Sequence, residues 1–221
     1  MLHFLDIFGT FVFAVSGAFR AVRHELDILG VLVLAIATGV GGGIVRDVML
    51  GDTPPAVFQH ELYLVIAVFG GVIVFIAAPK IAPRWDYVMI ADAVGLSVFA
   101  AIGAAKAETA ELGFIGIIMI ATITATGGGM IRDMLVMEIP AVLKSDFYAS
   151  AALLGGACFA ALDGLGLDKN SKLACAITVT FVLRVAAMKY KYSLPKVRSL
   201  PASPSQLTQM RKSKHNKEMK Q

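Results

Sequence analysis

One heptapeptide occurs twice in this chain, and its repetition constrains the fold more than any other feature. The motif at residues 41–47, GGGIVRD, returns at residues 127–133 as GGGMIRD, an offset of 127 − 41 = 86 residues. The match extends beyond the motif: residues 6–54 align with residues 92–140 without a gap and are identical at 19 of 49 positions. In this alignment Arg20 falls on Lys106. The chain is therefore two copies of one unit, and repeats of this kind are typical of membrane transport proteins.

Composition places both copies in a membrane. The chain is 57% hydrophobic and 16% charged, with a mean hydropathy of +0.74, whereas soluble domains carry about 25% charged residues. From Arg184 to the end there are ten Lys/Arg and one acid, so this tail carries 10 − 1 = +9 and the remaining body 10 − 15 = −5. The basic pI therefore belongs to the tail and does not indicate nucleic-acid binding.

The apolar stretches predict an all-α membrane protein with seven transmembrane helices, because open strands cannot cross lipid. We expect two inverted three-helix repeats followed by a seventh helix: repeat one at residues 1–85, repeat two at 86–162, the seventh helix at 163–190, and a basic, disordered tail at 191–221. The predicted spans are Phe4–Phe19, Ile28–Leu50, Leu62–Ala78, Tyr87–Ala105, Phe114–Val136, Phe147–Leu162 and Leu173–Met188.

The orientation follows from the odd number of spans in each repeat. Three spans return the chain to the opposite side of the membrane, so the second repeat enters inverted relative to the first. Basic residues mark the cytoplasmic side, and the strongly basic tail therefore predicts a cytoplasmic C-terminus and an outside N-terminus. The first span is not a cleaved signal peptide, because Asp6 interrupts it and it is duplicated around Asp92.

The glycine triplets are the first candidate functional feature. Gly in a helix interior costs about 1 kcal/mol against Ala, so three in succession predict that each helix unwinds or kinks and offers carbonyl oxygens to a cation. Close helix packing through small residues is the alternative. Hydroxyls inside the spans either line a pore or bond back to helix carbonyls. The candidate pore residues are Gly41, Gly42, Gly43, Gly127, Gly128, Gly129, Thr38, Thr124 and Ser16.

Ionisable residues are the second candidate feature, since charged groups within spans face the bundle interior or a cavity. Arg46-Asp47 and Arg132-Asp133 follow the glycines by one turn. Adjacent residues on a helix do not face each other, so each Arg is expected to pair with an acid of another helix. Such pairs either gate a pore or lock the bundle.

Asp6 and Asp92 open the first and fourth spans at matching positions. They either concentrate cations at the two mouths of a pore or stabilise the starts of their helices.

The sequence gives no sign of an enzyme or a cofactor site. It has no nucleophile with a placed base, and no metal or nucleotide motif. Cys158 and Cys175 lie in apolar spans and read as small core residues. The four histidines, at positions 3, 24, 60 and 215, show no ligand spacing.

The paired GGGxxRD motif in the second and fifth of seven spans resembles the prokaryotic trimeric intracellular cation (TRIC) channels, over about residues 2–188. The resemblance implies a homotrimer in the inner membrane, with one pore per subunit between the two glycine-containing helices, conducting K⁺ and less selectively Na⁺. It also implies that Arg46, Asp47, Arg132 and Asp133 hold or gate the constriction. The alternative is a secondary transporter of a small amino acid such as glycine, in which half-helix N-termini would bind a carboxylate.

Overall fold

The computed structural model describes residues 1–81, 85–144, 147–163 and 165–190, with the backbone alone described at residues 78–81 and 85–87. Every regular element in these ranges is an α-helix, which confirms the predicted all-helical class. The helices are α1 (Leu2–Arg23), α2 (Ile28–Leu50), α3 (Ala56–Gln59), α4 (Leu62–Ile81), α5 (Trp85–Thr109), α6 (Phe114–Leu135), α7 (Ala141–Lys144), α8 (Ala149–Asp163) and α9 (Lys169–Tyr190).

Each predicted span coincides with one of the seven longer helices. Among the described residues, α1, α2, α5, α6 and α9 contain stretches long and apolar enough to cross a membrane, while the apolar parts of α4 and α8 are shorter. That the chain crosses the bilayer seven times stays a prediction. The link between α2 and α4 contains the short helix α3, and the link between α6 and α8 contains the short helix α7. The predicted basic tail, 191–221, lies outside the described residues.

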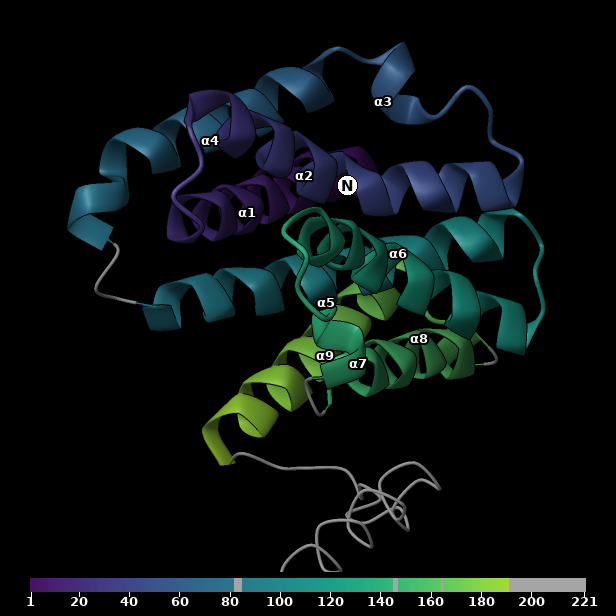
Figure 1. Ribbon diagram of the computed structural model, residues 1–221. Helices are drawn as coiled ribbons and strands as arrows, with labels where there is room; N and C mark the ends of the chain where they lie inside the picture. Colours follow the sequence, from purple (N-terminus) through teal and green to yellow (C-terminus); the bar gives the residue numbers. More distant parts are fainter. Residues whose placement is uncertain (82–84, 145–146, 164, 191–221) are drawn as a thin grey trace, which may run out of the picture.

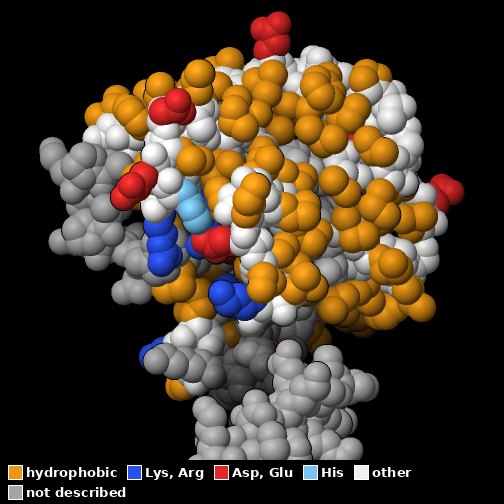
Figure 2. Space-filling model, in the orientation of Figure 1, with side chains coloured by type: hydrophobic (Ala, Val, Ile, Leu, Met, Phe, Trp, Pro, Cys, Tyr) orange, Lys and Arg blue, Asp and Glu red, His pale blue; other side chains and the backbone are white. Residues whose placement is uncertain are grey.

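Large apolar side chains cover the outside of the bundle. Ile76 is 73% exposed, Ile115 72% and Leu29 68%, and Figure 2 shows hydrophobic side chains over most of the visible face. Soluble monomers rarely expose continuous apolar patches beyond a few hundred Å². The surface is therefore suited to contact with lipid.

The two repeats end their helices in the same way. After α1, the Glu25 and Leu26 amides donate to Val22 and Ala21; after α5, Glu111 and Leu112 donate to Glu108 and Ala107. This pair of bonds is the Schellman arrangement, which closes a helix with one residue in the left-handed conformation. Glu25 and Glu111 have φ of 55° and 56°, and their equivalents after α2 and α6, Gly51 and Met137, have 75° and 56°. The duplication is thus preserved in backbone geometry as well as in sequence.

The repeats are inverted with respect to one another. Figure 1 shows α1, α2 and α4 as one layer and α5, α6, α8 and α9 as the other, with α2 packed on α6 and α1 on α5. Arg20, near the end of α1, bonds Asp133, near the end of α6, at 3.3 Å. Lys106, near the end of α5, bonds Asp52, just after α2, at 2.9 Å. Since α1 runs parallel to α6 and antiparallel to α2, the equivalent helices α2 and α6 run in opposite directions.

This inversion predicts the sidedness of two equivalent loops. Single cysteines at Thr53 and Ile139, which are both exposed, should react with an impermeant maleimide from opposite sides of the membrane. The background should lack Cys158 and Cys175. Labelling of both positions from the same side would contradict an inverted arrangement in the bilayer.

Candidate functional site

The centre of the molecule is a crossing of α2 and α6 at the two glycine triplets. A Cβ added at Gly42 would collide with the carbonyl oxygen of Thr124, and one added at Gly128 would collide with the carbonyl oxygen of Thr38. A Cβ at Gly127 would lie 3.3 Å from the Gly42 Cα. The two backbones are therefore in direct contact, and only glycine permits this approach.

The prediction was that each helix unwinds or kinks at its triplet; unwinding is wrong, and a kink stays a prediction. Both α2 and α6 are continuous α-helix through their glycines, because close packing of the two backbones occupies the space that an unwound segment would need. Thr38 and Thr124 are fully buried, and their hydroxyls donate to the carbonyls of Leu34 and Ile120, each at 2.6 Å. These hydroxyls were predicted either to line a pore or to bond back to helix carbonyls, and in the structure they bond back to the helix.

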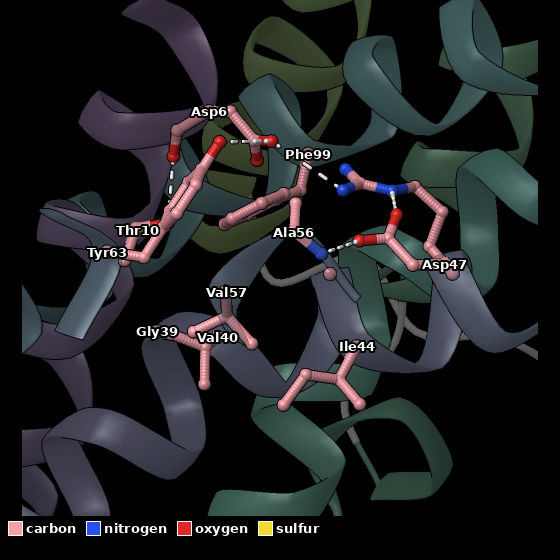
Figure 3. Close-up of a pocket in the computed structure, with 12 residues that line it drawn as sticks. Asp6, Thr10, Gly39, Val40, Ile44, Asp47, Ala56, Val57, Tyr63 and Phe99 are labelled. Carbon is pink, nitrogen blue, oxygen red and sulfur yellow. Dashed lines mark hydrogen bonds and ion pairs between the residues drawn. The ribbon is translucent and has the colours of Figure 1, made fainter. Parts of the chain in front are cut away.

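One charge cluster lies at the end of the bundle where α1 begins and α2 finishes. Arg46 is 1% exposed; its Nε donates to Asp47 Oδ1 at 2.8 Å, and a terminal nitrogen lies 3.6 Å from Asp6 Oδ2. Tyr63, on α4, donates its hydroxyl to Asp6 at 3.2 Å. Lys106 approaches Asp47 to 3.7 Å. Figure 3 shows Asp6, Tyr63 and Asp47 around a shared pocket.

The equivalent cluster lies at the opposite end. Arg132 donates Nε to Asp133 Oδ1 at 2.9 Å and Nη1 to Asp92 Oδ1 at 2.8 Å. The same Nη1 donates to the Ser16 hydroxyl at 2.8 Å. Arg20 bonds Asp133 in this cluster, just as Lys106 lies close to Asp47 in the first. Ser16 has no equivalent in the first cluster, since its aligned position is Ile102.

These contacts correct one expectation and confirm another. Each Arg does pair with an acid of another helix: Arg46 with Asp6 on α1, and Arg132 with Asp92 on α5. Each also bonds the adjacent Asp, contrary to the prediction, because the long Arg side chain folds back along its own helix end. The second oxygens of Asp47 and Asp133 accept from the backbone amides of Ala56 and Ala141, at 3.0 and 2.8 Å. Asp47 thereby holds the start of α3, and Asp133 holds the start of α7.

A pocket adjoins each cluster. The first has a volume of only about 10 Å³, roughly enough for one water molecule, and is lined by Asp6, Thr10, Arg46, Asp47 and Tyr63 together with the backbone around Gly39 and Gly43. The second has a volume of about 160 Å³ and is lined by Ser16, Arg20, Asp92, Arg132 and Arg184 with apolar neighbours. The glycine crossing lies between them. The first pocket is lined by two acids and one arginine, whereas the second is lined by three arginines and one acid.

Polar contacts at the rim join the two repeats. Lys106 donates to the exposed carboxylate of Asp52 and lowers its pKa through that hydrogen bond and its charge. At the other end, Glu138, which aligns with Asp52, bonds Arg20 at 3.4 Å and His24 at 2.8 Å. The end of α1 and the end of α5 therefore each form ion pairs or hydrogen bonds with the other repeat.

Sequence reasoning did not find several members of the site. Tyr63 was not among the predicted site residues, yet it is 6% exposed and bonds Asp6. Tyr148, 2% exposed, packs under the Arg184 guanidinium, which lies 4.7 Å from the ring centre. Arg20 and Lys106 carried a signal, since a cation at equivalent positions of both repeats indicates a shared role. Among the described residues, no group of three or more His, Cys, Asp or Glu could hold a metal ion.

Comparison with known proteins agrees with this geometry. One family model, described as glycine transporter, matches residues 3–79 and again residues 89–163. The two matches begin 89 − 3 = 86 residues apart, the offset of the glycine motifs. The UPF0126 inner membrane protein YadS of Escherichia coli (strain K12) is 38% identical over 198 residues, covering 88% of this chain and 95% of YadS.

Two solved structures match the chain at the same sequence identity as YadS. The TRIC trimeric intracellular cation channel orthologue from Rhodobacter sphaeroides is 38% identical with a TM-score of 0.83, covering 86% of this chain and 98% of that one. A prokaryotic TRIC channel crystallised in 0.5 M KCl is 38% identical with a TM-score of 0.82, covering 87% and 98%.

Inverted repeats that cross at glycine and carry a buried Arg–Asp cluster at each end define a duplicated integral membrane protein. This chain belongs to the prokaryotic TRIC family, whose members also carry the names glycine transporter and UPF0126 membrane protein.

The crossing predicts a difference between neighbouring glycines. Gly42→Ala and Gly128→Ala should each lower the free energy of unfolding by about 1–3 kcal/mol, because the added methyl meets a backbone carbonyl that cannot move aside. Gly43→Ala is the matched control: its Cβ would lie 3.6 Å from a terminal Arg46 nitrogen, an ordinary contact, and Ala gains up to about 1 kcal/mol of helix propensity. Thermal unfolding in detergent measures all three. Equal stability of the Gly42 and Gly43 variants would contradict the close crossing.

The second cluster predicts a large effect at Arg132. Arg132→Ala leaves Asp92 and Asp133 buried without their main partner, which should cost about 3–5 kcal/mol. Lys should restore little, since one ammonium cannot reproduce the guanidinium fork. Adding Asp92→Ala to Arg132→Ala should cost less than the sum of the two single changes. Lys144→Ala, an exposed cation on α7, is the control and should change stability by less than about 0.5 kcal/mol. Strictly additive effects of the Arg132 and Asp92 changes would show that this pair is not coupled.

Proposed function

We propose that this chain forms a cation channel that conducts K⁺ and less selectively Na⁺, with one pore per subunit between α2 and α6 of a homotrimer. The observation that carries the proposal is the position of a charge cluster and a pocket at each end of the glycine crossing, in a fold shared with solved TRIC cation channels. The protein would lie in the inner membrane, as YadS is named, with the N-terminus outside.

The proposed path runs from one pocket to the other along the α2–α6 contact. Asp6 and Asp92 stand at its two mouths, where carboxylates raise the local cation concentration. Between the two mouths, the path is bordered by backbone rather than by side chains, at residues 41–43 and 127–129, Thr38 and Thr124. Ser16 adds a hydroxyl near the second mouth. The body charge of −5 favours cations over anions, and the preference is strongest at the first pocket, which is lined by two acids and one arginine.

The described conformation corresponds to a closed path. Gly42 and Gly128 lie against backbone carbonyls of the facing helix, so no ion-sized gap remains at the crossing. Conduction would require α2 and α6 to separate there. The Arg46 and Arg132 pairs join these helices to α1 and α5, so exchange of their partners would accompany opening.

The glycine-transporter alternative is less well supported. A carrier of this type would bind the substrate carboxylate at half-helix N-termini exposed by a break, and neither α2 nor α6 is broken at its glycines. The solved proteins of high similarity are described as channels rather than carriers.

Planar-bilayer recording of the purified full-length protein tests the proposal. We expect discrete unitary currents in KCl, smaller currents in NaCl, and reduced K⁺ current in Asp6→Asn and Asp92→Asn. Glu61→Gln, a change in an exposed acid at the same end as Asp6, is the control and should leave the current unchanged. Saturable glycine uptake into proteoliposomes without unitary currents would contradict the channel.

A further inference from the structure

Two histidines that are far apart in the sequence lie side by side at the mouth of the first pocket. His3, in the first turn of α1, and His60, which ends α3, have ring centres 6.0 Å apart at an interplanar angle of 69°. Both side chains are exposed. Their separation of 57 positions explains why the sequence showed no ligand spacing.

A hydrogen-bond chain fixes the orientation of His3. The Tyr63 hydroxyl has one proton and donates it to Asp6, whose carboxylate also faces Arg46. The His3 Nδ1 lies 3.4 Å from the same hydroxyl oxygen. Because that oxygen's proton is already committed, Nδ1 must be the donor in this contact. The Nε2 of His3 then keeps its lone pair, and this is the tautomer that ligates metals.

The spacing of the rings fits a shared ion. Imidazole nitrogens bind Zn²⁺ at about 2.0–2.1 Å, and a tetrahedral angle between two such ligands places the ring centres about 5 Å apart. The observed 6.0 Å is close to this distance, and exposed side chains on a helix start and a link can adjust to it. Water would complete the coordination.

We propose that His3 and His60 form a binding site for a borderline divalent transition metal such as Zn²⁺, with Tyr63 and Asp6 as the outer partners that orient His3. Imidazole ligands select this class of ion over Mg²⁺ and Ca²⁺, which take oxygen ligands. The bound ion would clamp the start of α1 to the link between α3 and α4. It would be linked to Asp6, which lines the pocket, through His3 and two hydrogen bonds by way of the Tyr63 hydroxyl.

Equilibrium Zn²⁺ binding to the full-length protein, purified without a polyhistidine tag, tests the site independently of conduction. We expect one saturable Zn²⁺ per chain, with binding weakened at least about tenfold in His3→Ala and in His60→Ala. Tyr63→Phe removes the orienting hydroxyl and should weaken binding by about 10–100-fold. His24→Ala, a histidine at the opposite end paired with Glu138, is the matched control and should bind as the wild type does.

Thermal unfolding supplies a second measurement, because a ligand that binds only the folded state raises the unfolding temperature. Zn²⁺ should raise it in the wild type and in His24→Ala, but not in the double variant His3→Ala/His60→Ala, and Mg²⁺ should have no effect in any of them. Absence of saturable binding by the wild type would overturn the proposal. Undiminished binding by the double variant would also overturn it and would place the ion elsewhere, for example at Cys158 and Cys175.

Discussion

Direct backbone contact between α2 and α6 is the constraint on which the rest of the structure depends. Side chains at Gly42 or Gly128 would force the two helices apart. The same contact sets where the following turns of α2 and α6 lie, and therefore where Arg46 and Arg132 meet Asp6 and Asp92. The glycines at the crossing thus set the positions of the charge clusters through the geometry of the two helices.

The charge clusters show how a membrane bundle accommodates ions in its interior. Buried charges are costly unless paired and hydrogen-bonded, and each Arg here has two carboxylate partners while each central Asp also holds the start of a short helix. Breaking one contact therefore leaves others in place. A network whose charged groups have more than one partner can rearrange at lower cost than an isolated pair.

Most of the fold could be predicted from the sequence, because apolar length and duplication are strong local signals. The predicted bounds of the second span coincide with those of α2, and the cross-helix pairing of Arg46 and Arg132 followed from their burial. The state of the glycine helices could not be predicted, since a triplet is compatible with unwinding and with close packing, and only the facing Thr38 and Thr124 carbonyls decide between them. The roles of Tyr63 and of His3 with His60 depend on links whose path has no periodic signal.

The two repeats have the same residues at the glycine crossing but different polar side chains at the two rims of the bundle. Both repeats share the glycines, the Arg–Asp pairs and the helix-end turns, so the crossing looks the same from either repeat. At one rim, the Asp6 carboxylate accepts from the Tyr63 hydroxyl, which also contacts His3. At the other, Asp92 contacts Ser16 and Arg132, with Arg20 and Arg184 lining the same pocket. The duplication is therefore preserved where the two backbones touch, because only glycine fits there. The repeats differ in the polar side chains at the rims, where more than one residue type can satisfy the same carboxylate.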